Sequence, residues 1–419
     1  MLIEFSVKNF LSFKEKVTLS LEKVIGNENE ENTFTFNNEE LLKTAVIYGA
    51  NASGKSNLIK AFTTAILMVR NSSVIPLGGK WDILKPFLFS EDTNNSPSEF
   101  EFIFIANKIK YRYFFSADED KIYKESLDAY YSQKPTNIFT RKNTTEYNFI
   151  NSDRKTLESI ASKNTENKLF LTSATTWNYE KTKDAFLWFL NSIDTYSSFD
   201  SMLDKDLINY SNNDEDLKKF TLKLLKETDI FIKDLRVSYE ERDVENSSFI
   251  INNQKQGPLK TKSVKIALDH EITDSQIKKK IYTLDFEDES SGTKILFALA
   301  PILKRAFEKT KIIIVDELEK SLHPALVKYI IKLFNNEKLN TKNSQLIFTT
   351  HAISLLSLDL FRRDQIWFTE KDVLTGNSEL YPLDSFSVRK EENIEKGYIN
   401  GRYGAIPFIK DIDSWLEEK

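Results

Sequence analysis

The sequence lacks cysteine altogether and has only three histidines, three methionines and five tryptophans in 419 residues. Without cysteine the protein has no disulfides, thiolate metal sites or cysteine nucleophiles, which fits a reducing cytoplasm. No apolar run approaches the roughly 20 residues that a membrane-spanning helix needs. The opening Met1–Phe5 also lacks the charged and apolar regions of a signal peptide. We therefore expect a cytoplasmic protein with no membrane-bound part.

Charge of one sign is not in excess either, since 58 basic residues stand against 63 acidic ones and the net charge is -5. This balance gives no global argument for nucleic acid, so a surface for it has to be local. The local candidates are lysines in the second half of the chain: Lys255, Lys260, Lys262, Lys265 and Lys278–Lys280. A solvated face is the favoured interpretation, because aromatic side chains that could stack on bases are not interleaved. Nucleic acid stays open as a partner.

A glycine-rich stretch, Gly49–Ser56, fits the phosphate-binding P-loop pattern at every fixed position. The apolar run Thr44–Tyr48 before it predicts a buried strand, and a helical pattern follows it through about Val69. Strand, glycine loop and helix are the context of a genuine P-loop rather than of a chance turn. Backbone N–H groups and the helix N-terminus then face phosphate oxygens of ATP or GTP. The expected nucleotide-binding residues are Gly49, Asn51, Ala52, Ser53, Gly54, Lys55, Ser56 and Asn57.

Two further features supply the chemistry of such a site. Lys55 is expected to reach the β- and γ-phosphates, and the hydroxyl of Ser56 to hold Mg²⁺. Downstream, the apolar strand Lys311–Val315 ends in Asp316 and Glu317. An apolar run of this kind suits a central parallel strand, whose carboxyl end is where ligands of open α/β sheets bind. We expect Asp316 to hold Mg²⁺, directly or through water, and Glu317 to act as general base on the attacking water.

Two weaker motifs flank the acidic strand. Ser290 and Gly292 open an apolar helix whose N-terminus could meet a phosphate, although a serine that simply caps the helix is equally consistent. The strand Gln345–Thr350 ends at His351, which could donate to the γ-phosphate. The alternative there is a histidine satisfied at a strand end.

The order of these motifs resembles that of the ABC-type ATPases, in particular their SMC/RecF-like and OLD-like branch, rather than transporter cassettes. The resemblance implies an α/β P-loop NTPase core with an antiparallel β subdomain. It further implies a homodimer or higher even oligomer that sandwiches two ATPs between subunits. Ser290 and Gly292 would then contact the γ-phosphate bound by the other subunit. The loop at Ser321–His323 would cross the dimer interface, and His351 would be the switch histidine.

The sequence departs from this family pattern in two places. The signature reads Ser-Ser-Gly-Thr from Ser290 instead of the usual Ser-Gly-Gly-Gln, and no glutamine occurs between Lys55 and Gln133. The family places a glutamine after the P-loop helix to sense Mg²⁺. We therefore expect slow, switch-like ATP hydrolysis.

A closer resemblance comes from both ends of the chain. The opening Phe5–Phe13, the loop Gly49–Ser56 and the tail Gly397–Pro407 are similar to the bacterial RloA/AbiL-type ATPases, which are grouped with phage defence and abortive infection. The tail is equally consistent with a partner site and with a glycine-rich turn that docks the C-terminus. No Glu…Asp-x-Asp metal cluster follows His351, so we expect any nuclease or toxin effector to be a separate protein.

The layout of the chain predicts three parts. Residues 1–154 form the N-terminal part of the ATPase core, 155–275 an inserted, mainly helical unit, and 276–419 the C-terminal part of the core. Within the first part, alternating runs predict strands at 3–7 and 17–21 and a hairpin from 100 to 115, whereas 26–40 is polar and predicts a loop. In the insertion, Asn213–Asp216 is expected to supply the cap and the acidic first turn of a helix.

The motifs predict an ATP-hydrolysing enzyme, and the resemblance to RloA/AbiL-type ATPases implies that it is the sensor or motor subunit of an antiphage defence system. Two alternatives remain open. One is a RecF/SMC-like ATPase of DNA maintenance, which DNA-stimulated hydrolysis without a protein partner would favour. The other is a nucleotide-gated scaffold that holds a toxin and hydrolyses very little ATP. The missing glutamine favours this interpretation.

Overall fold

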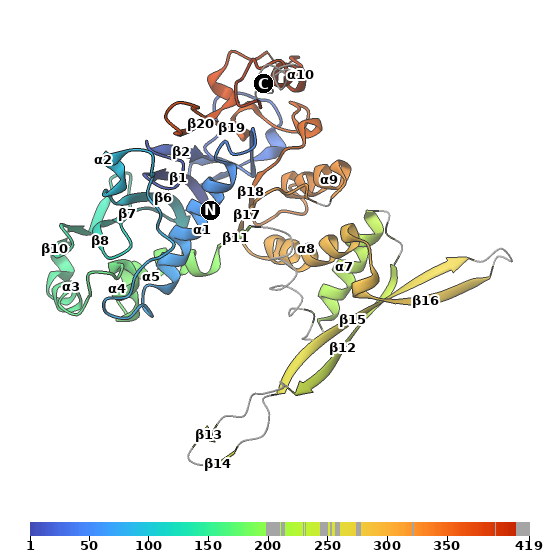
Figure 1. Ribbon diagram of the computed structural model, residues 1–419, viewed down its shortest axis with the longest axis horizontal. Coiled ribbons are helices and arrows are strands. Elements are labelled where there is room, and N and C mark those ends of the chain that lie inside the picture. The colour runs from blue at the N-terminus through green and yellow to red at the C-terminus, as the bar shows by residue number, and fades with distance from the viewer. Residues whose placement is uncertain are drawn as a thin grey trace, which may run out of the picture. The chain divides into compact units, whose positions relative to one another are not determined.

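The computed structural model describes residues 1–197, 210, 214–228, 230, 232–243, 250–251, 254–255, 260–273, 278–320, 322–389 and 391–407, with the backbone alone for 239–243, 250–251, 254–255 and 260–264. The chain forms two compact units, each with its own sheet and helices (Figure 1). The first unit comprises Met1–Ser197, Lys309–Glu319 and Val327–Lys419. The second comprises Ser198–Glu308 and Lys320–Leu326.

A six-stranded sheet in the first unit has the order β11-β17-β18-β5-β19-β20. Its strands are β5 (Thr44–Gly49), β11 (Ile193–Tyr196), β17 (Ile312–Val315), β18 (Gln345–Thr349), β19 (Ile366–Lys371) and β20 (Ser378–Pro382). All pairings are parallel except that of β20 with β19. β5, β17 and β18 are buried at every position, as expected for parallel strands covered on both faces. Their carboxyl ends lie at one edge of the sheet.

A seven-stranded antiparallel sheet forms the other layer of the first unit, in the order β10-β9-β8-β7-β6-β1-β2. Its strands are β1 (Leu2–Lys8), β2 (Val17–Ser20), β6 (Ser98–Ala106), β7 (Ile109–Ala117), β8 (Ile122–Tyr130), β9 (Thr136–Lys142) and β10 (Glu146–Phe149). The first two strands and the β6–β7 hairpin confirm the predictions from alternation. The hairpin turns at Asn107 and Lys108, whose φ values of 46° and 65° suit a tight two-residue turn.

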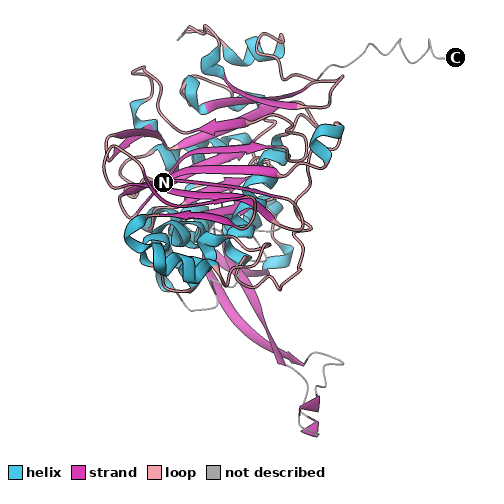
Figure 2. Cartoon of the chain, turned by 90° about the vertical axis from the view of Figure 1, so that its left-hand side faces the viewer, coloured by secondary structure: helices cyan, strands magenta, loops and turns pink. Residues whose placement is uncertain are grey.

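Helices of the first unit pack between and beside these sheets (Figures 1 and 2). They are α1 (Lys55–Asn71), α2 (Glu91–Asn94), α3 (Arg154–Ala161), α4 (Phe170–Thr176), α5 (Glu180–Asn191), α9 (Pro324–Asn335), which begins in the second unit, and α10 (Ile394–Ile399). α1 contacts α4 and α5 and contributes Phe62, whose ring stacks on Phe5 of β1 at 3.7 Å. One hydrophobic core contains side chains of both sheets and of α1. The α/β class with an antiparallel subdomain is therefore confirmed.

The expected loop at 26–40 is wrong in part. The structure has a short hairpin there, formed by β3 (Thr33–Phe36) and β4 (Glu39–Leu42). Asn37 and Asn38 occupy its turn with φ values of 51° and 68°, a conformation that asparagine tolerates better than most residues. The polar composition concealed the strands because apolar Phe34 and Leu41 alternate with polar and charged residues.

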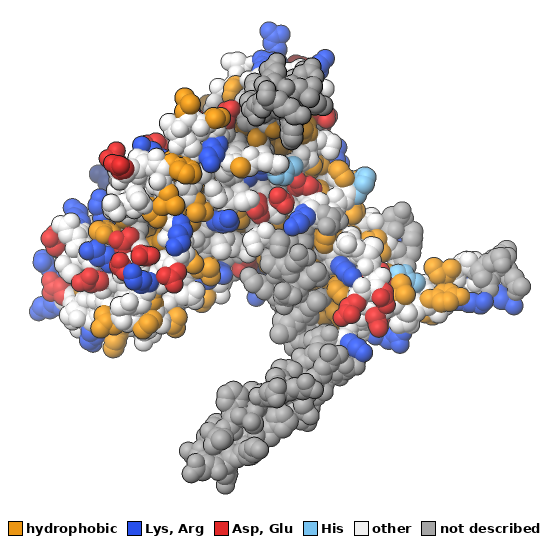
Figure 3. All heavy atoms as spheres, viewed as in Figure 1, with side chains coloured by type: hydrophobic (Ala, Val, Ile, Leu, Met, Phe, Trp, Pro, Cys, Tyr) orange, Lys and Arg blue, Asp and Glu red, His pale blue; other side chains and the backbone are white. Residues whose placement is uncertain are grey.

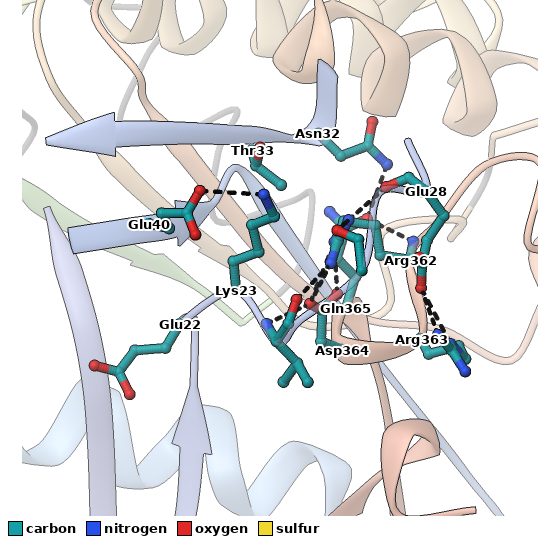
Figure 4. A network of polar contacts seen from close by, with 12 residues as sticks. Glu22, Lys23, Glu28, Asn32, Thr33, Glu40, Arg362, Arg363, Asp364 and Gln365 are labelled. Atoms are coloured by element: carbon teal, nitrogen blue, oxygen red, sulfur yellow. Dashed lines mark hydrogen bonds and ion pairs between the residues drawn. The ribbon is translucent and has the colours of Figure 1, made fainter. Parts of the chain in front are cut away.

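A buried polar network joins residues 22–32 to the region just before β19 (Figure 4). The guanidinium of Arg362 forms an ion pair with Asp364 at 2.9 Å and also donates to the carbonyl of Val24 at 3.0 Å. Gln365 Nε2 donates to the carbonyl of Thr44 at 3.0 Å. Because Gln365 immediately precedes β19 and Thr44 begins β5, this network helps fix β19 beside β5, the strand that leads into the P-loop.

The described residues of the second unit form two long helices and a three-stranded antiparallel sheet of order β12-β15-β16. Its elements are α7 (Glu215–Glu227), β12 (Ile232–Asp243), β13 (Ile250–Ile251), β14 (Gln254–Lys255), β15 (Lys260–Thr273), β16 (Lys279–Asp285) and α8 (Ser291–Glu308). α7 packs against α8 and β12. The Asp214 side chain accepts from the amides of Asp216 and Leu217 at 3.0 and 2.9 Å, so the cap expected within Asn213–Asp216 is present and Asp214 supplies it.

These units differ from the insertion expected at 155–275. Helices α3, α4 and α5 belong to the first unit, and the second unit begins at Ser198 and extends through α8 to Glu308. Its described part is as much strand as helix, because β12 and β15 pair over most of their length. That pairing joins segments separated by a long stretch of chain, so local periodicity gives it no signal. Within the described residues, no helix is long and apolar enough to cross a bilayer.

Candidate functional site

The loop between β5 and α1 is shaped by two glycines that touch neighbouring strands. A Cβ at Gly49 would lie 2.4 Å from the carbonyl oxygen of Thr369 on β19. Gly54 has a φ of 122°, and a Cβ there would lie 2.8 Å from Ser378 Oγ on β20. Neither position has room for a side chain. The predicted strand, loop and helix are all present, with α1 beginning at Lys55.

Lys55 is almost fully buried and turns its ammonium group back into the loop. Its Nζ donates to the carbonyls of Gly49 at 2.7 Å and Ala50 at 3.0 Å. Burial lowers the pKa of Lys55 to about 8, while Asp316, Glu317 and Glu319 oppose that shift through their negative charge. The cation is therefore held inside the loop, beside three carboxylates, where phosphate oxygens can replace the carbonyls as its partners.

Two side chains that no sequence pattern singled out support the P-loop. Thr369 Oγ1 on β19 lies 2.6 Å from Ser53 Oγ. Ser12 Oγ accepts from the side-chain amide of Asn57 at 2.9 Å, and the Ser12 carbonyl accepts from Ser378 N at 2.7 Å. Asn57, expected at the nucleotide, thus connects α1 to the segment between β1 and β2. Only a three-dimensional structure brings Ser12, Thr369 and residues 53–57 together.

The acidic pair follows β17 at the same edge of the sheet as the P-loop, with β18 between them. Asp316 Oδ1 accepts from the hydroxyl of Thr349, the last residue of β18, at 2.6 Å. The amide of Glu317 donates to the same hydroxyl oxygen at 2.7 Å. Glu317 has a φ of 51°, which is uncommon for a residue other than glycine and typical of strained functional positions. Thr349 therefore sets the orientation of both acids, and the sequence did not single it out.

His351 lies beside the second acid, as its place after β18 predicts. Its Nε2 is 3.7 Å from Glu317 Oε1, and both side chains are partly exposed. Its backbone amide donates to Glu319 Oε1 at 2.5 Å. The other carboxylate oxygen of Glu319 is buried without a hydrogen-bond partner in the described part of the chain. Glu319 is a further residue that sequence reasoning missed, and it holds the backbone that carries His351.

These residues fit a magnesium nucleotide. Ser56 in the first turn of α1 and Asp316 after β17 offer a hydroxyl and a carboxylate, the oxygen ligands that Mg²⁺ prefers together with phosphates and water. The hydroxyl of Thr349 donates to Asp316 Oδ1, and this hydrogen bond fixes the orientation of the carboxylate. Among the described residues, no three acidic or histidine side chains gather as a metal-binding group.

A pocket of ≈ 1290 Å³ opens beside the P-loop within the first unit. It is lined by Ala50–Ser53, by the turn between β19 and β20, and by residues 401–407 of the glycine-rich tail. The tail is docked rather than extended, because Tyr398 OH donates to the carbonyl of Ala405 at 2.8 Å and the Tyr403 ring stacks on Phe368 at 6.0 Å. Docking, one of the two interpretations of this motif, is thus present for residues 397–407.

The signature residues belong to the second unit. Ser290 Oγ accepts from the amide of Thr293 at 3.2 Å and lies 2.8 Å from Thr293 Oγ1. Ser290 therefore caps α8, which is the alternative that its sequence left open. Gly292 is the second residue of α8. Ser321, in the loop expected at the dimer interface, lies outside the described residues.

The candidate basic surface is only partly described. Side chains of Lys255, Lys260 and Lys262 lie outside the described part, and Lys279 forms an ion pair with Glu271 at 2.7 Å. Figure 3 shows basic and acidic side chains interspersed over the visible face of the described residues. These observations favour a solvated face of mixed charge.

A match to a protein-family model agrees with the geometry of the site. A family described as "AAA domain, putative AbiEii toxin, Type IV TA system" matches residues 45–357, a range that contains every candidate site residue. No curated protein matches the chain significantly. Similar solved structures include an SMC head domain from Thermotoga maritima, with a TM-score of 0.39 and 16% identity over 91% of this chain and 98% of that one. An SMC head bound to the C-terminal winged-helix domain of ScpA has a TM-score of 0.40 and 15% identity, covering 91% and 97%.

The parallel sheet, its P-loop and the acids at the same edge define an ATPase of the P-loop class. Because the matched range exceeds half of the chain, the protein belongs to the family of AAA-domain proteins with that description.

Proposed function

We propose that the protein binds and hydrolyses ATP with Mg²⁺. The observation that carries this proposal is the convergence of Lys55, Asp316 and Glu317 at one edge of the parallel sheet, with Thr349 orienting both acids. A buried ammonium group beside carboxylates is the charge arrangement that a magnesium nucleotide requires, because cation and anion sites lie next to each other. The family to which the chain belongs supports the same class of activity.

Each residue has a defined part in hydrolysis. Lys55 and the P-loop amides hold the β- and γ-phosphates, and Ser56 and Asp316 hold Mg²⁺, which neutralises phosphate charge. The Glu317 carboxylate accepts a proton from water as the water oxygen bonds to the γ-phosphorus. The bond between that phosphorus and the bridging oxygen breaks, which gives ADP and phosphate. His351, held by Glu319, donates to the γ-phosphate.

The working assembly is a homodimer or higher even oligomer in which Ser290 and Gly292 of one subunit meet the γ-phosphate held by the other. The proposal is supported by the position of Ser290 and Gly292 at the N-terminus of α8, where backbone amides favour an anion. The cap at Ser290 is compatible with this role, because its oxygen accepts from Thr293 while its hydrogen can be directed at phosphate. Slow turnover follows from the altered signature and the missing glutamine.

In the cell the protein acts as the sensor or motor subunit of an antiphage defence system with a separate nuclease or toxin effector. Two observations support this role. The family description includes a putative toxin of a type IV toxin–antitoxin system. The ends of the chain resemble RloA/AbiL-type ATPases, and the tail that carries part of this resemblance is docked beside the P-loop.

The first test is ATP binding and hydrolysis by purified wild type, Lys55→Ala and Glu317→Gln. We expect Lys55→Ala to lose nucleotide binding and Glu317→Gln to bind without hydrolysis. Lys60→Ala is the matched control, because Lys60 is an exposed lysine of the same helix. Equal ATP affinity of Lys55→Ala and wild type would overturn the site.

The defence role is tested by phage plating on cells that carry the native locus. Protection by wild type and Lys60→Ala, and loss of protection with Lys55→Ala and Glu317→Gln, supports ATP-dependent defence. No protection against a broad phage panel contradicts it. ATP hydrolysis stimulated by DNA alone would then favour the DNA-maintenance function, and partner release without phosphate production would favour the nucleotide-gated scaffold.

A further inference from the structure

A short polar contact connects the signature segment of the second unit to its sheet. His270 lies on the long strand β15, and its Nε2 is 2.6 Å from Oε1 of Glu289, the residue directly before Ser290. The Glu289 side chain is only 5% exposed and that of His270 is 21% exposed. A short, largely buried contact of this kind restrains both partners far more than an exposed ion pair does.

The segment that carries Glu289 is a short connection between β16 and α8. It consists of a 3-10 turn, Phe286–Asp288, followed by Glu289 and Ser290. The turn is attached to α8 by the ring contact of Phe286 with Phe297 at 5.1 Å and by Lys294 Nζ, which donates to the Glu287 carbonyl at 2.6 Å. The His270–Glu289 pair adds an attachment to β15, so the connection is fixed to the helix on one side and to the sheet on the other.

We propose that His270 is a positioning residue for ATP hydrolysis, acting through Glu289 on Ser290 and Gly292. The pair fixes the backbone just before Ser290, so the serine hydroxyl and the first amides of α8 keep one direction. That direction matters because an anion at a helix N-terminus is bound by amides that must already point at it. This inference rests on the proposed function, in which the signature of one subunit meets the γ-phosphate of the other.

Loss of the pair has a predictable physical effect. Removing His270 leaves the nearly buried Glu289 carboxylate without its hydrogen-bonding partner, and the segment moves to bring that carboxylate into water. A displacement of about 1 Å at a phosphate-binding group can lower the rate of chemistry by about 100-fold. The P-loop of the same chain is unaffected, so binding of ATP to the isolated subunit stays the same.

The test compares His270→Leu, Glu289→Leu and Glu289→Gln, all in the full-length protein. We expect both leucine variants to bind ATP with wild-type affinity and to show kcat reduced about 10- to 100-fold. Glu289→Gln keeps an oxygen that accepts from a neutral histidine, so it should retain most of kcat. The control is Glu308→Gln, which removes the ion pair of Lys304 with Glu308 near the other end of α8.

A second readout separates this inference from the proposed function. In a Glu317→Gln background, ATP-dependent dimerisation is measured by sedimentation, and the leucine variants should weaken it about 10-fold or more. If the wild-type protein shows no ATPase activity, the proposed ATP hydrolysis is refuted. Weakened dimerisation of the leucine variants would still support the positioning role of His270. Unchanged kcat and dimerisation in both leucine variants, or failure of Glu289→Gln to restore either, overturns it. Absence of any ATP-dependent dimer also overturns it.

Discussion

The hydroxyl of Thr349 lies 2.6 Å from Asp316 Oδ1 and 2.7 Å from the amide nitrogen of Glu317. A single side chain at the end of β18 therefore holds both acids at the end of β17. The hydroxyl donates to the carboxylate and accepts from the amide, so both of its hydrogen-bonding functions are used. This relationship gives a role to a residue that is not itself expected to touch the nucleotide.

Replacement of Thr349 by valine removes that hydroxyl while nearly preserving side-chain shape. We expect kcat for ATP to fall about 10- to 100-fold, because each lost hydrogen bond costs about 1 kcal/mol or more and 1.4 kcal/mol corresponds to tenfold. Nucleotide affinity should change little, since the P-loop is untouched. Steady-state phosphate release and ATP titration measure the two effects. Thr63→Val on α1, where the hydroxyl donates within the helix to Ile59 at 2.9 Å, is the control.

Glu317→Gln tests the general base. The amide has similar size and cannot accept the proton of the attacking water, so hydrolysis should fall by at least 100-fold while ATP binding persists. Single-turnover phosphate release and size-exclusion chromatography with ATP follow the two properties, and a stable ATP-bound dimer is expected. The exposed Glu337 on the same unit provides the control variant Glu337→Gln. Hydrolysis at the wild-type rate in Glu317→Gln would exclude this residue as the base.

The parts of the site that sequence reasoning predicted are those formed by consecutive residues. Strand, loop and helix from Thr44 to Asn71 follow directly from apolar pattern and glycine spacing, and the acids after β17 follow from a short apolar run. Their roles in catalysis stay predictions. Thr349, Glu319 and Thr369 were missed because hydroxyls and carboxylates at strand ends are common, and only strand order shows which motif each one contacts.

The second unit shows the same limit on a larger scale. A cap within Asn213–Asp216 and the helix after it were predicted correctly, because a cap and its helix are local. The pairing of β12 with β15 was not predicted, because paired residues such as Leu235 and Leu268 are far apart in sequence. The helices α3, α4 and α5 were assigned to an insertion because they share its helical pattern, whereas their packing against α1, β6 and β10 places them in the first unit.

Lys55 makes nucleotide binding depend on pH. Burial lowers the pKa of this amine to about 8 in the nucleotide-free protein. Bound phosphates favour the charged form, so the pKa rises on binding and a proton is taken up above pH 8. ATP affinity should therefore be constant below about pH 7 and fall as pH rises through 8, by up to tenfold per pH unit.

Calorimetric titration of ATP between pH 7 and 9.5, in buffers of different ionisation enthalpy, measures both the affinity and the proton uptake. Lys60→Ala should reproduce the wild-type profile, because Lys60 is exposed to solvent. An affinity that stays flat across this range, without proton uptake, contradicts a Lys55 pKa near 8.

Two adjacent arginines provide a test of what holds β19 beside β5. Arg362 is 1% exposed and pairs with Asp364, which is 5% exposed, whereas Arg363 is 33% exposed and pairs with Glu28 at 3.0 Å. Burial raises the pKa of Asp364, against the opposing effect of Arg362. Removing Arg362 alone leaves a buried carboxylate without its partner, and breaking a buried pair in this way costs about 3–5 kcal/mol of unfolding free energy.

Arg362→Met should therefore destabilise the protein by about 3–5 kcal/mol and Arg363→Met by about 1 kcal/mol or less. Urea unfolding followed by circular dichroism gives both values under the same conditions. The double variant Arg362→Met/Asp364→Leu should recover part of the loss, because the unpaired carboxylate is removed together with the arginine. Equal effects of the two single substitutions would show that the buried network of Figure 4 does not fix this edge of the sheet. A large loss of unfolding free energy for Arg362→Met, with a small loss for Arg363→Met, would show that the network fixes this edge of the sheet. The position of β5, the strand that leads into the P-loop, would then depend on residues outside the loop itself.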